Sequence, residues 1–178
     1  MRLIDLTEDY MNINLKNKIE ARHTTIKTLL KDQKFYIDYF QRDYRWQEKH
    51  IKTLIEDLTF TFFNSYNTND KPSDVVNYQS YYLGTVVLSM NTETSKNSII
   101  DGQQRMTSIT LFLIYLNHLQ RKFDEENKVP ISDLIFSVSR REKSFNMTDE
   151  NRTECLKALF ERGEYICKET DDETVINM

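Results

Sequence analysis

Residues 97–105 read Asn-Ser-Ile-Ile-Asp-Gly-Gln-Gln-Arg and are followed at once by an apolar run, residues 106–119. A short β-branched run, an Asp-Gly step and a long apolar segment predict a strand, a sharp turn and a helix. The N-terminus of that helix favours anions, because its N–H groups are unpaired and the helix dipole is positive there. Arg105 adds a planar fork of donors that suits phosphate or carboxylate. The chain has only three glycines, so Gly102 indicates a backbone that turns sharply and approaches a ligand closely.

The same residues also have a purely structural interpretation. Asp101 is a good helix N-cap, and Gln104 three residues later resembles the second half of a capping box. Gln103 and Arg105 are not needed for capping, which leaves them available for a second role.

A second informative segment, residues 35–46, interleaves aromatic residues with Arg42 and Arg45 and contains the single tryptophan, Trp46. One interpretation is an edge strand whose aromatic side chains pack on the core while its arginines lie in solvent. Aromatic and cationic residues in this arrangement also suit stacking on bases and pairing with phosphates. Composition alone leaves both interpretations open.

Taken together and in this order, the two segments resemble the N-terminal domain of GmrSD-type restriction proteins. The family pattern is Tyr-Gln-Arg-x-Tyr-x-Trp, a helix ending near Leu-x-x-Asp, a Leu-Gly-x-hydrophobic strand, and Asp-Gly-Gln-Gln-Arg. The resemblance runs from about residue 25 to residue 119, with a weaker echo in residues 148–160. One departure is that the family has prolines before its Gln-Arg, where this chain has Asp38, Tyr39 and Phe40. The matching residues are Gln41, Arg42, Tyr44, Trp46, Leu54, Asp57, Leu83, Gly84 and Asp101 through Arg105.

The resemblance implies an α+β fold, with a ParB-like core of a small mixed sheet and packed helices followed by a helical C-terminal part. We expect the ParB-like domain over residues 1–124 and the start of a truncated helical extension over residues 125–178. The implied function is nucleotide binding and NTP hydrolysis in a regulatory domain of a bacterial anti-phage restriction protein. DNA cleavage would belong to a separate domain or subunit with a His-Asn-His nuclease motif, which the scattered histidines of this chain do not form.

The resemblance also implies roles for individual residues, with an NTP and Mg²⁺ as the bound groups. Phosphates would sit at the N-terminus of the helix over residues 103–123, where Gly102 gives backbone access and Arg105 neutralises charge. Gln103 or Gln104 would orient a water, and Asp101 would cap the helix or hold Mg²⁺, with Asp57 a weaker metal candidate. The expected sites are catalytic Asp101, Gln103, Gln104 and Arg105; nucleotide-binding Gln41, Arg42, Tyr44, Gly102 and Arg105; DNA-binding Arg45 and Trp46; and metal-binding Asp101.

Two other function classes remain open, a ParB-like nuclease and a DNA-recognition module that hydrolyses nothing. The formal charge of −4 provides no global basic field, so DNA contact must be local or made through the full-length protein. No membrane partner is expected, because the N-terminus is too charged for a signal peptide and residues 106–119 are too few to span a bilayer. We therefore predict a cytoplasmic protein.

Hydrophobic periodicity and turn residues predict the other elements. Cys155 falls on an apolar helix face and is predicted to be a buried small residue. The C-terminal tail, residues 168–178, is polar and acidic, so we expect it to be frayed. The expected elements are helices over residues 16–31, 48–64, 103–123 and from 148 or 149 to 160; strands over 35–40, 81–90 and 98–100; a long mobile loop over 65–78; and a strand or helix start over 134–138.

Overall fold

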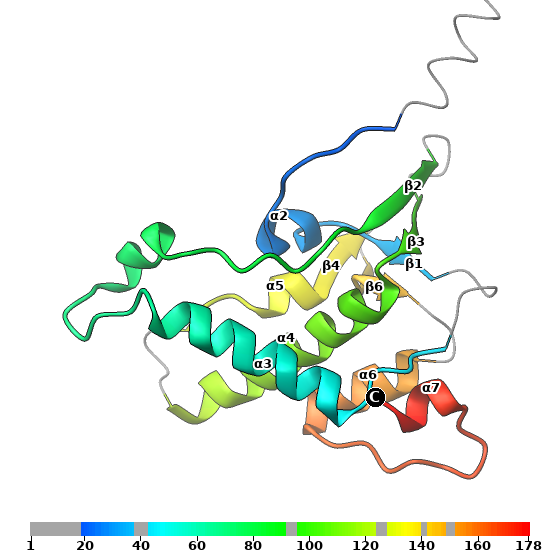
Figure 1. Cartoon of the computed structure of the whole chain (residues 1–178). Helices are drawn as coiled ribbons and strands as arrows, with labels where there is room; N and C mark the ends of the chain where they lie inside the picture. The colour runs from blue at the N-terminus through cyan, green and yellow to red at the C-terminus, as the bar shows by residue number, and fades with distance from the viewer. Residues whose placement is uncertain (1–18, 38–42, 92–95, 124–127, 140–141, 149–151) are drawn as a thin grey trace, which may run out of the picture.

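Over the described residues, the chain forms a four-stranded mixed sheet and a two-stranded sheet combined with helices, so the fold is α+β as predicted (Figure 1). The structure, a computed structural model, describes residues 19–37, 43–91, 96–123, 128–139, 142–148 and 152–178. The described elements are α2 (Ile26–Leu30), β1 (Phe35–Tyr36), α3 (Glu48–Phe63), the 3-10 helix η1 (Pro72–Asn77), β2 (Val87–Asn91), β3 (Lys96–Asp101), α4 (Gln103–Phe123), α5 (Ser132–Ile135), β4 (Phe136–Ser139), β5 (Glu142–Phe145), β6 (Met147–Thr148), α6 (Thr153–Arg162) and α7 (Glu173–Ile176).

Helix α4 lies in the core and has the bounds that its apolar pattern predicts. Its first turns bury Met106 and Ile109, and they also bury the small polar residues Thr107, Ser108 and Thr110. Small hydroxyl side chains can be buried here because they bond within the helix, as Thr110 Oγ1 does to the Met106 carbonyl at 2.9 Å. The core consists of Leu30, Phe35, Leu54, Ile99, Met106, Ile109, Leu113, Ile114, Ile135, Phe145, Met147 and Leu156.

The main sheet brings three strand ends to the edge at which α4 begins. Its strand order is β2-β3-β1-β6. β2 and β3 form the predicted antiparallel hairpin, with Leu88 opposite Ile99. β1 pairs in parallel with both β3 and β6, so all three strands end at one edge, beside the start of α4 (Figure 1). Ligands of open sheets with parallel strands bind outside that edge.

Asn146 joins three parts of the fold through its side chain and main chain. Its Nδ2 donates to the carbonyls of Leu30 and Leu134, each at 2.9 Å. Its main-chain N–H donates to the Ile135 carbonyl at 2.7 Å, and its own carbonyl accepts from Phe35 N at the same distance. Because Asn146 is buried, these bonds satisfy main-chain groups that are buried or partly buried.

Two predicted elements in the N-terminal half begin later than expected. The described part of the helix predicted over residues 16–31 begins only at Ile26, because Thr25 caps it by accepting from Thr28 N. The strand predicted over residues 81–90 begins at Val87, after Gly84 with its φ of +93°. The predicted strand over residues 35–40 is described only as Phe35–Tyr36, since residues 38–40 lie outside the described part. Helix α3 confirms the prediction over residues 48–64, and η1 occupies part of the predicted loop.

The C-terminal part corrects two predictions. Helix α6 begins at Thr153 with Arg152 at its N-cap, so Thr148, which belongs to β6, does not cap it, and Asp149 lies outside the described residues. The prediction of a frayed tail is wrong, because Asp172 caps α7 by accepting from Val175 N at 2.9 Å. Residues 134–138 contain both predicted alternatives, the end of α5 and the start of β4.

The domain boundary near residue 124 stays a prediction. Elements from beyond it pack with elements from before it, since β6 pairs with β1 and α6 contacts α4.

Cys155 of α6 is buried, as predicted, and burial raises the pKa of its thiol to about 11. A thiol with this pKa stays protonated at neutral pH, which makes it a core residue rather than a nucleophile.

Replacing Asn146 tests its role in joining these elements. Asn146→Ala removes the donor from one buried and one partly buried carbonyl, and we expect the free energy of unfolding to fall by about 2–4 kcal/mol. Chemical denaturation measures this change, with Glu164→Ala at an exposed position as the control. Equal stability of the two variants would show that water or a rearranged side chain replaces the amide.

Candidate functional site

The Asp-Gly turn between β3 and α4 has the predicted strand-to-helix form. Gly102 has a φ of +94°, a conformation that favours glycine. A Cβ on Gly102 would lie 3.1 Å from Val86 Cγ2 and 3.3 Å from the Thr85 carbonyl oxygen. The glycine is therefore required by the turn and by the close packing of residues 85–86 on it.

Gln104 links this turn to the second sequence motif. Its Oε1 accepts from the N–H of Arg45, and its Nε2 donates to the carbonyl of Asp43, each at 2.8 Å. The capping-box interpretation of Asp101 and Gln104 is therefore wrong, because the Gln104 amide bonds to residues 43–45 instead. We call this pair of bonds the Gln104 bridge.

Tyr44, the residue between the two bridged positions, is fixed on every side. Its ring is buried, and its hydroxyl hydrogen-bonds to Ser108 Oγ of α4 at 2.8 Å. Its N–H donates to Thr174 Oγ1 and its carbonyl accepts from Asn177 Nδ2, each at 3.1 Å. Burial raises the pKa of the Tyr44 hydroxyl. The C-terminal residues thus pack beside the start of α3, near which the chain ends in Figure 1.

Arg105 extends from the first turn of α4 toward residues 84–85. Its Nη1 donates to the carbonyl of Thr85, and its Nη2 lies 3.9 Å from Asp101 Oδ2. The Arg105 side chain is 29% exposed and the Asp101 side chain 65%, so this long ion pair contributes little to stability. Gly84 leaves room for the guanidinium, because a Cβ there would lie 2.8 Å from Arg105 Nη1.

Arg105 borders a groove of about 330 Å³, which we call the α3–α4 groove. At one place in it, Trp46 and His50 stack with ring centroids 6.0 Å apart and an interplanar angle of 29°. The Tyr81 hydroxyl donates to Asp57 Oδ2 at 2.9 Å, and this bond raises the pKa of Tyr81. The lining residues are Trp46, His50, Thr53, Leu54, Asp57, Tyr81, Leu83, Arg105 and Ile109. A groove of this size accommodates a small organic ligand.

The sequence-predicted residues are only partly brought together. Arg105 and Trp46 line the groove, whereas Arg45 has a largely exposed side chain with Nη2 3.9 Å from Asp43 Oδ2. Gln103 is buried, and Asp101 is exposed beside Arg105. Gln41 and Arg42, predicted to close the pocket, lie outside the described residues. Within the described ranges, no cluster of three or more His, Cys, Asp or Glu side chains is arranged to hold a metal ion.

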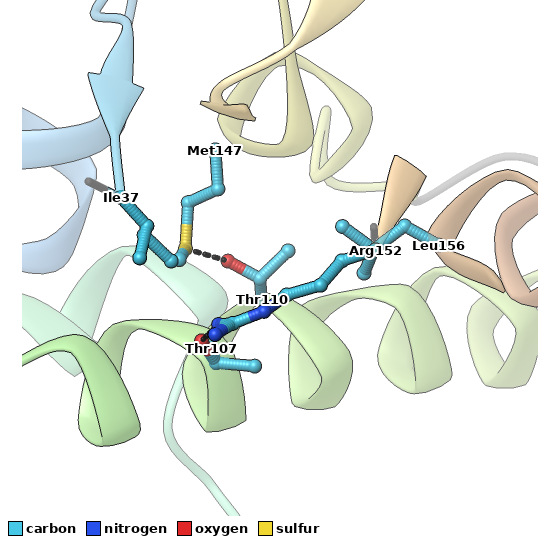
Figure 2. A pocket seen from close by; sticks show the side chains of 6 residues that line it. All are labelled: Ile37, Thr107, Thr110, Met147, Arg152 and Leu156. Carbon is cyan, nitrogen blue, oxygen red and sulfur yellow. Dashed lines mark hydrogen bonds between the residues drawn. The ribbon is translucent and has the colours of Figure 1, made fainter. Parts of the chain in front are cut away.

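Arg152 is a buried cation that the sequence did not single out. Figure 2 shows its side chain extending from the start of α6 to Thr107 of α4, and its Nη1 donates to Thr107 Oγ1 at 3.1 Å. Beside it, Thr110 Oγ1 lies 3.2 Å from the sulfur of Met147. The cavity between these residues, about 10 Å³, holds at most a water molecule. An arginine just before an amphipathic helix gives no sequence signal that separates it from a surface residue.

His50, Asp57 and Tyr81 also line the groove, although sequence reasoning did not select them as the main site residues. Asp57 was expected only as a weaker metal candidate, and His50 only as one of the scattered histidines that form no nuclease motif. The available signal was spacing, because positions 50, 53, 54 and 57 recur at three- and four-residue steps on one face of α3.

Comparison with known proteins gives one family match. The sequence model described as "GmrSD restriction endonuclease, N-terminal domain" matches residues 26–177, which is most of the chain. A search of curated proteins finds no match. None of the helices among the described residues has the length and apolar character needed to cross a membrane.

Removing the Gln104 bridge tests whether it holds residues 43–45 on α4. Gln104→Ala deletes two partly exposed hydrogen bonds, so we expect a loss of about 1–2 kcal/mol of stability and a changed emission spectrum of Trp46. Gln120 of α4 offers a matched control, because its amide likewise donates to the Val129 carbonyl and accepts from Val129 N, each at 3.1 Å.

Gln120→Ala should cost similar stability and leave the emission of Trp46 unchanged, since Trp46 lies in the groove with Ile109, and Gln120 is about 16 Å further along α4. Fluorescence spectra and denaturation curves of both variants measure the two effects. Unchanged Trp46 emission in folded Gln104→Ala would mean that other contacts position the segment.

Proposed function

The chain belongs to the family of GmrSD restriction endonuclease N-terminal domains, and from this premise we propose that it binds and hydrolyses nucleoside triphosphates as the regulatory domain of a DNA restriction protein. The observation that carries the proposal is the position of Arg105, which reaches into the α3–α4 groove from the turn where β3 meets α4. A planar cation in a groove of this size suits the phosphates of a nucleotide.

Two further features support phosphate binding at this place. The start of α4 carries the positive end of the helix dipole, and α4 begins at the edge where three strands end. The segment that contains Gln41 and Arg42 follows β1, which ends at that edge. We therefore retain Gln41 and Arg42 as partners of Arg105 in holding phosphate, with the ParB-like arrangement of the core as part of the proposal.

Hydrolysis of a bound NTP requires a water molecule placed in line with the γ-phosphorus. The water oxygen forms a bond to phosphorus, the bond from phosphorus to the β–γ bridging oxygen breaks, and the proton lost by the water passes to solvent, leaving a nucleoside diphosphate and inorganic phosphate. In the proposed site, Arg105 neutralises phosphate charge while Gln103 or Gln104 orients the water. Gln104 combines this role with the bridge to Asp43 and Arg45, since an amide has two donor hydrogens and two acceptor lone pairs.

The remaining groups of the proposed site have separate tasks. Tyr44 positions the motif from the core, while Gly102 provides the turn. Asp101 has an exposed carboxylate that can hold Mg²⁺ through water, since Mg²⁺ usually keeps several of its waters when bound. Mg²⁺ would neutralise charge on the phosphates.

DNA enters the proposal through the full-length protein. Arg45 is exposed and Trp46 borders the groove, so they are the residues we assign to DNA contact. Cleavage belongs to a His-Asn-His-type nuclease domain or subunit, and the cytoplasm is the expected place of action on DNA. Nuclease activity of this domain itself, or DNA recognition without hydrolysis, are the alternatives that the test below separates.

Replacing Arg105 is the direct test. We expect Arg105→Ala to weaken NTP binding by about 1.5–3 kcal/mol, the scale of a hydrogen bond to a charged group. Stability should fall by only about 1 kcal/mol, because the ion pair with Asp101 is long and exposed. Calorimetric titration with each NTP and Mg²⁺, phosphate release and thermal melting measure these quantities.

Arg45→Ala serves as the matched control, because it removes the same charge from a position outside the lining of the groove. Plasmid nicking and DNA binding by the wild-type chain are measured alongside. A large fall in the melting temperature of Arg105→Ala with unchanged NTP affinity would show that Arg105 stabilises the fold and does not bind phosphate. Nicking or DNA binding without any phosphate release would favour one of the two alternatives.

A further inference from the structure

The α3–α4 groove has two chemically different ends. Tyr81 and Asp57 are joined by a hydrogen bond at one end, whereas Arg105 contacts Gly84 and Thr85 at the other. The chain from Tyr81 to Thr85 spans at most about 14 Å, which limits the separation of the two ends. Leu54 and Leu83 lie in the lining as well and provide apolar surface. The groove therefore combines a cationic end, an apolar part and an anionic end.

The positions of two lining residues along α3 indicate the same order of cationic and anionic ends. His50 and Asp57 are seven residues apart, about 10 Å along the helix axis, and both line the groove. The N–H of Gln47 donates to His50 Nδ1 at 2.9 Å, so the neutral ring carries its proton on Nε2. Nε2 is then a second donor for an anionic group in the groove, alongside Arg105. The length is comparable to that of a nucleoside 5′-phosphate.

Asp57 retains acceptor capacity at its end of the groove. Tyr81 is its one hydrogen-bond partner among the described residues, and that bond uses a single lone pair of Oδ2. An ionised carboxylate accepts several hydrogen bonds and donates none. It therefore selects a ligand edge that presents two neighbouring donors.

We propose that the Asp57 end of the α3–α4 groove is a base subsite selective for guanine, with Asp57 as the specificity-determining residue. This rests on the proposed nucleotide function and names its substrate, a guanosine triphosphate. Guanine presents N1–H and the N2 amino group side by side, and both donate to one carboxylate. Adenine and cytosine place a ring nitrogen lone pair beside their amino group, and uracil flanks its one N–H with carbonyl oxygens, so each sets an acceptor against the Asp57 carboxylate.

The apolar part of the groove complements this selection. Leu54 and Leu83 offer surface to the faces of a planar base, while the stacked Trp46 and His50 lie toward the start of α3. The phosphates then extend toward Arg105 and His50 Nε2. A base other than guanine leaves the Asp57 carboxylate without a second hydrogen-bond donor, which is costly when water is excluded. The preference for guanine therefore arises from rejection of the other bases as well as from attraction of guanine.

Titration of the whole chain with GTP, ITP, XTP and ATP in the presence of Mg²⁺ tests the proposal, with inorganic tripolyphosphate as a probe that lacks a base. We expect GTP to bind about tenfold or more tightly than ATP, and ITP, which lacks the N2 amino group, to fall between them. Tripolyphosphate should bind the wild type and every Asp57 variant equally.

Asp57→Asn gives a reciprocal switch that a merely structural role would not produce. Asparagine still accepts from Tyr81 and from N1–H, but its amino group donates, which suits the C2 carbonyl of xanthine. We expect the variant to lose about tenfold in GTP affinity and to gain affinity for XTP. Glu56→Gln removes the same charge from a neighbouring exposed position of α3, and it should leave the order of affinities unchanged.

The outcomes separate the guanine subsite from the proposed phosphate site. Equal binding of all four nucleotides, or an Asp57→Asn variant that keeps the wild-type preference for GTP over XTP, overturns the guanine subsite. In that case, binding of tripolyphosphate leaves the proposed phosphate site standing. Failure of every nucleotide and of tripolyphosphate to bind contradicts both the proposed function and this inference.

Discussion

The carboxamide of Gln104 bonds at both of its ends to the main chain of Asp43 and Arg45, and the arrangement of the site depends on this pair of bonds. They hold two motifs, about sixty residues apart in sequence, against the first turn of α4. Tyr44 between them is fixed by Ser108 and by the C-terminal residues Thr174 and Asn177. Trp46 and α3 follow directly, so the position of one wall of the groove is set by the helix that supplies Arg105.

Helix α4 carries both apolar and small polar residues because it has two structural roles. Its apolar residues fill the core, while buried small hydroxyls allow Tyr44 and Arg152 to approach its first turns closely. Gly102 and Gly84 serve the same turn from both sides, one by its conformation and the other by leaving space for the Arg105 guanidinium. Arg105 thus stays partly exposed at a groove instead of being enclosed in the core.

Local patterns predicted the elements whose apolar periodicity is long and unbroken, α3 and α4, and the turn whose glycine has a positive φ. The capping-box interpretation failed because a glutamine amide at the start of a helix can bond equally well to a distant segment, and sequence spacing does not separate the two. Burial of Arg152 and order in the tail arise from contacts across long sequence separations. The sequence offered Asp57 only as a weaker metal candidate and did not offer His50, because their place in a shared groove with Tyr81 and Arg105 depends on tertiary packing.

The central claim, that the start of α4 and the segment leading to β2 form one nucleotide-binding site, is tested most directly by NMR. Backbone amide resonances of the ¹⁵N-labelled chain are followed while GTP and Mg²⁺ are added. The account predicts that amides of Gly102–Arg105 and of Tyr81–Thr85 shift together with one dissociation constant. Shifts confined to the exposed aromatic end of α3 around Phe63, with none at these two segments, would contradict it.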